Sequence, residues 1–330
     1  ATGVLLYELC TGAPPFADVA LQELPQIVNQ RDATPLYSVA PAVDPRLAAI
    51  IDRCLRRDPA QRFASGDELR EALEQLRPNA KAEAPPEGNP YRGLLAFEAE
   101  HRGLFFGRKS EVGTILERLR TDPFVLVVAD SGIGKSSLCR AGVLPHVTDG
   151  ALGGGRTWTV RAMVPGKRPL AALCNEPAPL LGLSEDALAS KLRSDPSELG
   201  RMLHKQLAGD RGVVLFIDQL EEIVTIGAED EATVVAEALG YLCSRIHSAR
   251  MLMTVRSDFL ARVATLPGLG EELARGLYLL RPLMPDRIKE AITGPGAAKG
   301  VHFENEALVD ALANETARTD GGLPLLQFAL

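Results

Sequence analysis

A phosphate-binding motif occupies residues 129–137, which read Ala-Asp-Ser-Gly-Ile-Gly-Lys-Ser-Ser. Four apolar residues at 125–128 precede it and predict a buried parallel strand, and the pattern after it predicts a helix. In a strand, loop and helix of this kind, the backbone N–H groups of residues 132–135 form an anion cradle, to which the helix N-terminus adds its partial positive charge. Lys135 can then reach the β- and γ-phosphates, and the hydroxyl group of Ser136 can ligate Mg²⁺.

The motif departs from the usual phosphate loop at its first position, where this chain has Ala129 in place of glycine. That position ends the strand more than it contacts phosphate, so the departure weakens the match only slightly. A chance turn of small residues before a helix is the alternative interpretation. The apolar strand before the loop and the Lys-Ser pair within it favour phosphate binding.

A second strand, at residues 213–217, ends in the carboxylate Asp218. Parallel sheets place ligand chemistry at the carboxyl ends of their strands. Asp218 is therefore expected to hold Mg²⁺ through water, opposite Ser136. Glu221 or Glu222 would orient or deprotonate the attacking water, and the pattern does not say which. Alone, the segment would equally fit a strand followed by a solvated acidic turn; its pairing with the phosphate loop favours the catalytic interpretation.

Two arginines near the expected site each have two interpretations. Arg256 ends a third apolar strand, where it could sense the γ-phosphate as a fixed cation or pair with Asp258 at the surface. Arg108 follows Gly107 in the segment Leu-Phe-Phe-Gly-Arg. It is either a surface arginine after a core turn or a contact to neighbouring loops, with Gly107 letting the backbone approach the nucleotide base.

Length, charge and cysteine content limit the classes of protein that the sequence can represent. The 330 residues suffice for two domains, and the net charge of −7 argues against broad binding of nucleic acid. The five cysteines have no metal-ligand spacing and indicate a reduced, cytoplasmic protein. The sequence has no signal peptide and no apolar run of membrane-spanning length. The first residue is not Met and Leu330 continues a helical pattern, so we expect a piece of a longer protein that binds protein partners through its missing regions.

The order of elements predicts an α/β fold in which a parallel sheet carries helices on both faces. Helices are expected before the phosphate loop, at 110–119, and across 170–208. The expected strands follow the chain at 125–128, 156–164, 213–217, 250–256 and 277–280.

We expect four segments: a small helical region at 1–77, a linker at 78–90, the nucleotide domain at 91–285 and the start of a helical domain at 286–330. The linker is rich in proline and poor in bulky apolar residues. In the last segment, a helix from 286 is expected to stop at Gly294-Pro-Gly296, and a second helix spans 303–316. A third helix would have Pro324 in its first turn, where the missing N–H costs nothing.

Two motifs in residues 1–77 resemble the end of the C-terminal lobe of eukaryotic-like serine/threonine kinases. "GVLLYELCTGAPPF" is similar to the large central helix of that lobe and the loop after it. "CLRRDPAQRFAS" is similar to the late motif whose arginine, here Arg62, forms a buried ion pair with an upstream glutamate. The resemblance implies that the catalytic elements and the partner of Arg62 precede Ala1. Kinase activity is thus expected only of a longer parent; an unrelated helical bundle is the alternative.

The ordered segments "FFGR", "ADSGIGKSS", "LFIDQLEE" and "LMTVRSDF" are similar to the STAND class of P-loop ATPases, most of all to the bacterial novel STAND NTPases, which often follow a kinase domain. The resemblance covers about residues 89–330. It implies a metal role for Asp218, water chemistry at Glu221 and Glu222, and a sensor role for Arg256. The expected nucleotide-binding residues are Gly132, Ile133, Gly134, Lys135, Ser136, Ser137, Arg108 and Pro324.

The resemblance implies a switch that binds ATP or ADP with Mg²⁺, hydrolyses ATP slowly and forms nucleotide-dependent oligomers. Gly322-Leu-Pro324 resembles the Gly-x-Pro motif through which the helical domain of such proteins touches the nucleotide; a plain helix start is the alternative. Two other functions remain open. One is a protein kinase in the full-length parent, and the other is an inert scaffold with a degenerate phosphate loop, which Ala129 would suggest.

Overall fold

The computed structural model describes residues 2–20, 22–28, 30–74, 76, 86–207, 209–245, 248–319 and 321–330. The chain forms two compact units, Ala1–Ala82 and Glu83–Leu330. Residues 78–85 of the expected linker lie outside the described residues. Within the described part, every helix is too short or too polar to cross a membrane.

The first unit is a small group of helices around an apolar core. Gly3 lets the first helix approach the fourth, because a Cβ on Gly3 would lie 2.5 Å from the Cβ of Cys54. Its core residues are Tyr7, Leu36, Ala48 and Ile51. Its helices are α1 (Thr2–Thr11), α2 (Leu24–Ile27), α3 (Leu36–Val39), α4 (Pro45–Cys54), η1 (Pro59–Gln61) and α5 (Gly66–Glu74).

Arg62 of this unit binds backbone rather than a carboxylate. Its Nε donates to the carbonyl of Arg56 at 2.7 Å, and Nη2 donates to the carbonyl of Arg57 at 3.2 Å. Among the residues described here, no acidic side chain forms an ion pair with it. The arginine thus folds onto its own loop.

The second unit is built on a five-stranded parallel sheet, which confirms the expected α/β fold. Its strand order is β2-β3-β4-β1-β5, so β4 lies between the strand of the phosphate loop and the strand that ends before Asp218. All five strands coincide with segments expected from the sequence. They are β1 (Phe124–Ala129), β2 (Thr157–Met163), β3 (Arg211–Ile217), β4 (Ala249–Arg256) and β5 (Leu277–Leu279).

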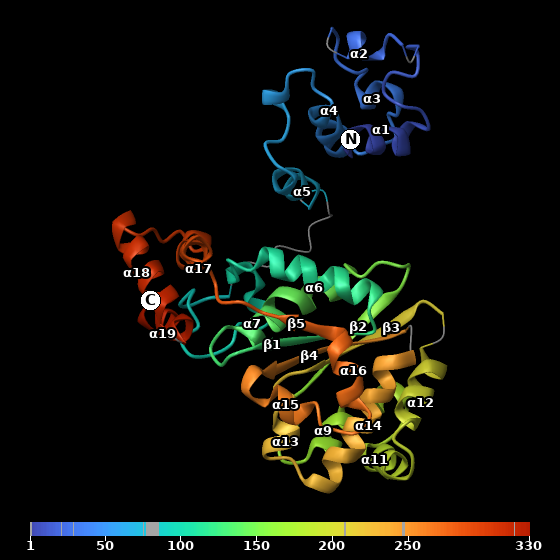
Figure 1. Cartoon of the computed structure of the whole chain (residues 1–330), viewed down its shortest axis with the longest axis vertical. Helices are drawn as coiled ribbons and strands as arrows, with labels where there is room; N and C mark the ends of the chain where they lie inside the picture. Colours follow the sequence, from blue (N-terminus) through green and yellow to red (C-terminus); the bar gives the residue numbers. More distant parts are fainter. Residues whose placement is uncertain are drawn as a thin grey trace. The chain divides into compact units, whose positions relative to one another are not determined.

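Alternating residues of β1 face two separate cores, which explains its continuous apolar sequence. Phe124, Leu126 and Val128 face one core, whereas Val125 and Val127 face the other. Helices cover both faces of the sheet, as predicted, and Figure 1 shows α6 on one side and α9, α11, α14 and α16 on the other.

Two sets of helices cover the two faces of the sheet. One face is covered by α6 (Lys109–Thr121), the π-helical turn η3 (Leu138–Val143) and α8 (Leu144–Thr148). The other is covered mainly by α9 (Pro169–Asn175), α11 (Glu185–Ser194), α12 (Glu198–Gln206), α14 (Glu229–Arg245) and α16 (Leu269–Gly276). Shorter elements are η2 (Ala99–Leu104), α7 (Lys135–Ser137), α10 (Ala178–Leu181), α13 (Glu222–Thr225), η4 (Ser257–Phe259) and α15 (Leu260–Val263).

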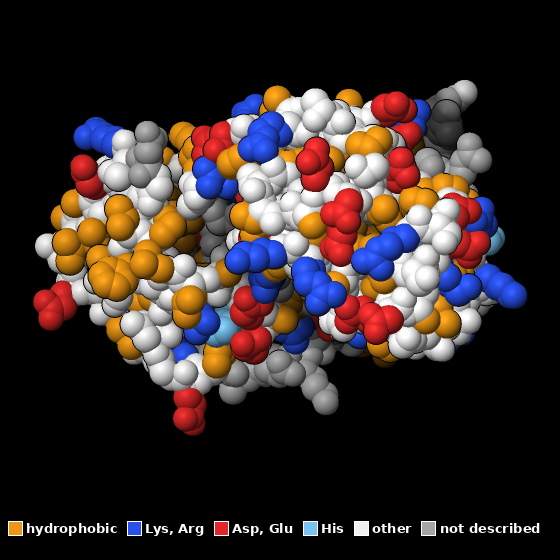
Figure 2. All heavy atoms as spheres, turned by 90° about the horizontal axis from the view of Figure 1, so that it is seen from below, with side chains coloured by type: hydrophobic (Ala, Val, Ile, Leu, Met, Phe, Trp, Pro, Cys, Tyr) orange, Lys and Arg blue, Asp and Glu red, His pale blue; other side chains and the backbone are white. Residues whose placement is uncertain are grey.

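Three C-terminal helices form a core of their own, which includes Ile288, Ile292, Val309 and Leu326. The helices are α17 (Pro285–Ala298), α18 (Glu306–Arg318) and α19 (Gly322–Ala329). Figure 2 shows hydrophobic side chains gathered at this end of the unit, and Phe328 is 70% exposed.

The expected end of the first of these helices at Gly294-Pro-Gly296 was wrong, because α17 continues through Pro295 to Ala298. The hydroxyl group of Tyr91 donates to the carbonyl of Ile292 at 2.6 Å, two residues before Gly294. Gly294 packs so closely that a Cβ there would lie 2.4 Å from Cγ of Phe106. Tertiary packing therefore outweighs the cost of the proline and glycines within the helix.

Tyr91→Phe removes the hydrogen bond to α17 and leaves the ring in place. We expect the free energy of unfolding of the second unit to fall by about 1 kcal/mol, because the buried carbonyl of Ile292 loses a donor. Chemical denaturation measures the change. The control is Tyr278→Phe, which makes the same chemical change at a half-buried tyrosine. Equal destabilisation by both substitutions would contradict a specific role for the Tyr91 hydroxyl group.

Candidate functional site

The loop after β1 has the backbone geometry of an anion cradle. Gly132 and Gly134 have φ angles of +80° and +94°, a region that favours glycine. The helix begins at Lys135 and continues into the π-helical turn η3. A Cβ on Gly132 would lie 3.4 Å from Cγ of Pro324, so this glycine also allows α19 to pack against the loop.

Lys135 folds back over the loop. Its Nζ donates to the carbonyls of Ala129 and Asp130, both at 2.8 Å. Burial lowers the pKa of Lys135, and the nearby carboxylate of Glu221 opposes this shift. The ammonium group therefore lies at the cradle, with its hydrogen bonds made to groups that a bound phosphate can replace.

Asp218 connects the phosphate loop with two other elements. Its side chain is 2% exposed, and Oδ1 accepts from Ser136 Oγ at 2.9 Å and from Thr254 Oγ1 at 2.6 Å. Oδ2 accepts from Nε of Arg140 at 3.0 Å. Ser136 and Asp218, which the sequence predicted to face each other, are thus in contact. Hydroxyl and carboxylate oxygens are ligands that Mg²⁺ prefers, so the pair fits the expected metal.

Thr254 and Gln219 belong to the site, although the sequence analysis did not identify them. Thr254 is a fully buried polar residue in the apolar strand β4, and the backbone N–H of Gln219 donates to its hydroxyl group at 2.9 Å. Gln219 has a φ of +59°, the one positive value for a non-glycine residue in the described chain. Strained backbone of this kind clusters at functional sites. For Thr254, the available sequence signal was a single threonine within an otherwise apolar strand.

The two candidate acids after β3 point to different places. Glu221 is 7% exposed, lines the cavity and accepts from the backbone N–H of Arg256 at 3.3 Å. Burial raises the pKa of Glu221. Glu222 instead accepts from the backbone N–H of Gly166 at 2.8 Å and is not among the residues that line the cavity.

Arg256 combines features of both interpretations given above. Its Nε and Nη2 donate to Asp258 at 3.1 and 2.7 Å, and the side chain is 42% exposed. The residue nevertheless lines the cavity, and its backbone holds Glu221. Solvent screens an exposed ion pair and leaves it weak, so this arrangement leaves the guanidinium group free to exchange partners.

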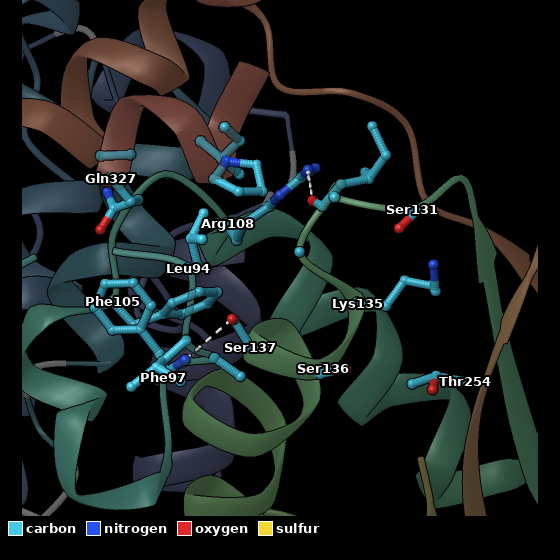
Figure 3. A pocket seen from close by; sticks show the side chains of 18 of the residues that line it. Leu94, Phe97, Phe105, Arg108, Ser131, Lys135, Ser136, Ser137, Thr254 and Gln327 are labelled. Carbon is cyan, nitrogen blue, oxygen red and sulfur yellow. Dashed lines mark hydrogen bonds between the residues drawn. The ribbon is translucent and has the colours of Figure 1, made fainter. Parts of the chain in front are cut away.

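Arg108 is buried and braces the phosphate loop from behind. Its side chain is 4% exposed, and Nη2 donates to the carbonyl of Ile133 at 3.1 Å, as the dashed line in Figure 3 shows. Nη1 donates to Glu111 at 2.6 Å and to the carbonyl of Arg281 at 2.8 Å. The surface interpretation of this arginine is therefore wrong, and its contacts are to neighbouring segments. Gly107 approaches the backbone of α17, since a Cβ there would lie 2.5 Å from the carbonyl oxygen of Arg287.

One cavity is lined by the phosphate loop, Glu221 and Arg256, and has a polar and an apolar end. In Figure 3, Lys135 and Gln327 lie on opposite sides of it. Pro324 of α19 also lines the cavity, so a ligand there touches both the sheet and the C-terminal helices. Leu94, Phe97 and Phe105 lie on the side away from Lys135, as Figure 3 shows. Further apolar side chains in the lining are Leu95, Leu104, Phe106, Leu283 and Leu323. The shape suits a ligand with a charged tail and a flat, apolar head.

Comparisons with known proteins give the family and the fold of the second unit. Residues 90–330 match the family described as Novel STAND NTPase 1. The structure of the Aeropyrum pernix ORC1 protein in complex with DNA is similar to this chain with a TM-score of 0.50 and 13% identity, covering 73% of this chain and 63% of that one. This likeness shows the fold. No curated protein matches the sequence.

Two further solved structures are similar at lower scores. The Walker-type ATPase PABY2304 of Pyrococcus abyssi has a TM-score of 0.45 and 16% identity, covering 70% of this chain and 67% of that chain. Domain III of the Thermotoga maritima replication initiation protein DnaA has a TM-score of 0.42 and 15% identity, covering 68% of this chain and 81% of that chain. The present chain spans less than two thirds of the ORC1 chain, at 63%.

The raised pKa of Glu221 predicts a pH-dependent effect of Glu221→Gln on stability. Folded Glu221 binds its proton more tightly than the unfolded chain does, so its stabilising effect is present below the unfolded pKa and is lost as pH rises through the folded pKa. Glu221→Gln is expected to raise the thermal midpoint by a few degrees near pH 8, with the gain vanishing near pH 4.

Differential scanning calorimetry across this pH range measures the effect. Glu222→Gln is the matched control, because it makes the same chemical change at the carboxylate bound to Gly166. A gain that does not vary with pH, or an equal gain in both variants, would contradict the buried environment assigned to Glu221.

Proposed function

The chain belongs to the novel STAND NTPase 1 family through residues 90–330, and we propose that it is a signal-transduction switch that binds ATP or ADP and hydrolyses ATP slowly. The observation that carries this proposal is the contact of Ser136 with Asp218 at 2.9 Å, because Ser136 lines a cavity that α19 also lines. Phosphate binding and the position of the C-terminal helices can then be linked through one ligand.

In the proposed complex, the backbone amides of residues 132–137 hold the phosphates and Lys135 neutralises their charge. Ser136 and Asp218 would hold Mg²⁺, which supplies Lewis-acid stabilisation of the β- and γ-phosphate oxygens. The apolar end of the cavity would take the base. The buried position of Arg108 against Ile133 supports a fixed loop geometry in both nucleotide states.

Glu221 is our candidate for the residue that activates water. It faces the cavity, and its raised pKa makes it a stronger base than an ordinary carboxylate. It would accept a proton from the water that attacks the γ-phosphate. Glu222 is bound to Gly166 and would have to break that hydrogen bond to act.

The switch requires contacts that differ between ATP and ADP. Arg256 would exchange Asp258 for the γ-phosphate, and the exposed position of that ion pair supports such an exchange. Pro324, packed beside Gly132, would transmit the change to α19. We propose that the ADP form is closed and that the ATP form assembles into oligomers.

For the first unit we propose the end of a serine/threonine kinase C-lobe, which would be active only within a longer bacterial protein. The backbone hydrogen bonds of Arg62 support a motif separated from its usual partner. We propose a cytoplasmic protein whose partners are other proteins rather than nucleic acid, in keeping with its net charge of −7.

Lys135→Ala is expected to weaken nucleotide binding at least a hundredfold, because the phosphates lose their cation at the cradle. Isothermal titration with ATP and Mg²⁺ measures the affinity. The control is Lys289→Ala, since Lys289 pairs with Asp310 on the surface outside this cavity. Unchanged affinity in Lys135→Ala would reject nucleotide binding at this loop and would favour an inert scaffold.

Glu221→Gln is expected to lower the rate of ATP hydrolysis by about 10²-fold or more while ATP binding persists, because the water loses its base. Release of inorganic phosphate under single-turnover conditions measures the rate. Glu222→Gln should retain most of the activity. The reverse result, with only Glu222→Gln inactive, would contradict the assignment of Glu221.

A further inference from the structure

Arg140 joins the carboxylates of Asp218 and Glu98, which come from distant parts of the chain. It lies in η3, the π-helical turn that follows the phosphate loop. Its Nε donates to Oδ2 of Asp218 at 3.0 Å, and Nη1 donates to both carboxylate oxygens of Glu98 at 3.0 and 3.2 Å. One planar guanidinium group therefore fixes the relative positions of two acids.

The bond from Arg140 fixes the rotation of the Asp218 carboxylate, with one oxygen facing Ser136. Oδ1 accepts from the hydroxyl groups of Ser136 and Thr254, and Oδ2 is bound by Arg140. Because the side chain of Asp218 is 2% exposed, Oδ2 would otherwise be a charged oxygen without its cationic donor in a place that water scarcely reaches. Loss of Arg140 is thus expected to disturb the orientation of the carboxylate.

Glu98 follows the segment that lines the apolar end of the cavity. Residues 94–97 belong to that lining, and the backbone N–H of Phe97 donates to Ser137 Oγ at 3.1 Å, a bond drawn in Figure 3. The Glu98–Arg140 ion pair lies beside this bond, since Glu98 is the residue after Phe97 and Arg140 lies about one helical turn after Ser137. Two bonds therefore attach the base end of the cavity to the helical run that begins at the phosphate loop.

We propose that Arg140 is a positioning residue that couples occupation of the apolar end of the cavity to the orientation of Asp218. The inference rests on the proposed binding of a magnesium nucleotide. A base that packs against residues 94–97 holds Glu98 in place; Glu98 holds Arg140, and Arg140 holds the metal-facing carboxylate. The contribution of Mg²⁺ to nucleotide affinity then depends on Arg140.

The test compares ADP and ATP affinities measured by isothermal titration in Mg²⁺ and in EDTA. The quantity compared is the dissociation constant in EDTA divided by that in Mg²⁺. For Arg140→Gln we expect this ratio to fall about tenfold, because one charge-assisted hydrogen bond to Asp218 is lost. Glu98→Gln should shift the ratio in the same direction by less. The double variant should lose no more than Arg140→Gln alone, since both act through one connection.

Arg118→Gln is the matched control for a merely structural role. Its side chain is 25% exposed, against 26% for Arg140, and it also joins a carboxylate, Asp122, to another segment. We expect this variant to lower the thermal midpoint without changing the Mg²⁺ ratio. Where Arg140→Gln does not fold, Arg140→Lys decides, because lysine keeps the charge but cannot bridge both acids with a planar fork.

An unchanged ratio in the folded Arg140 variant would overturn the inference, and an unchanged ratio in Glu98→Gln would overturn the link to the base end. These results differ from failure of the proposed function itself. If the proposed nucleotide binding at the loop were wrong, Lys135→Ala would bind nucleotide as well as the unchanged protein does in the same assay.

Discussion

The buried carboxylate of Asp218 is the interaction on which the arrangement of the site depends. Its exposed fraction is 2%, and a charge in such a place is stable only when its oxygens are bound by donors. The donors are Ser136 from the phosphate loop, Thr254 from β4 and Arg140 from η3. Because these residues come from three elements, the same carboxylate fixes the loop against the sheet and against the helical run that follows it.

The parallel sheet makes this convergence possible. β4 lies between β1 and β3, and the pairing of Ala129 with Arg256 and of Ile217 with Met253 brings the carboxyl ends of all three strands to one edge. The C-terminal helices meet the same edge through Pro324, which packs beside Gly132. A ligand in the cavity would therefore touch the parts of the unit that a switch must move relative to each other.

The strands, the phosphate loop and the pairing of Ser136 with Asp218 could be predicted from the sequence, because each follows from local pattern and from the edge rule for parallel sheets. The passage of α17 through Pro295 could not, since the helix packs there against Tyr91 and Phe106, which are distant in sequence. The contact of Arg140 with Asp218 was equally hidden, because an arginine in a helix carries no sign of its partner. The different surroundings of Glu221 and Glu222 could not be predicted either, because they depend on the actual turn after β3, which sends consecutive side chains to different places.

Amide hydrogen exchange of the whole chain, with and without ADP and Mg²⁺, tests most directly whether one nucleotide joins the loop to the C-terminal helices. We expect exchange to slow both at residues 132–137 and in α19, because the same ligand contacts the cradle and the helix that begins beside Pro324. Protection of the loop without α19 would contradict the link between nucleotide and helices. Unchanged exchange at the loop, at nucleotide concentrations in the millimolar range, would contradict the site itself.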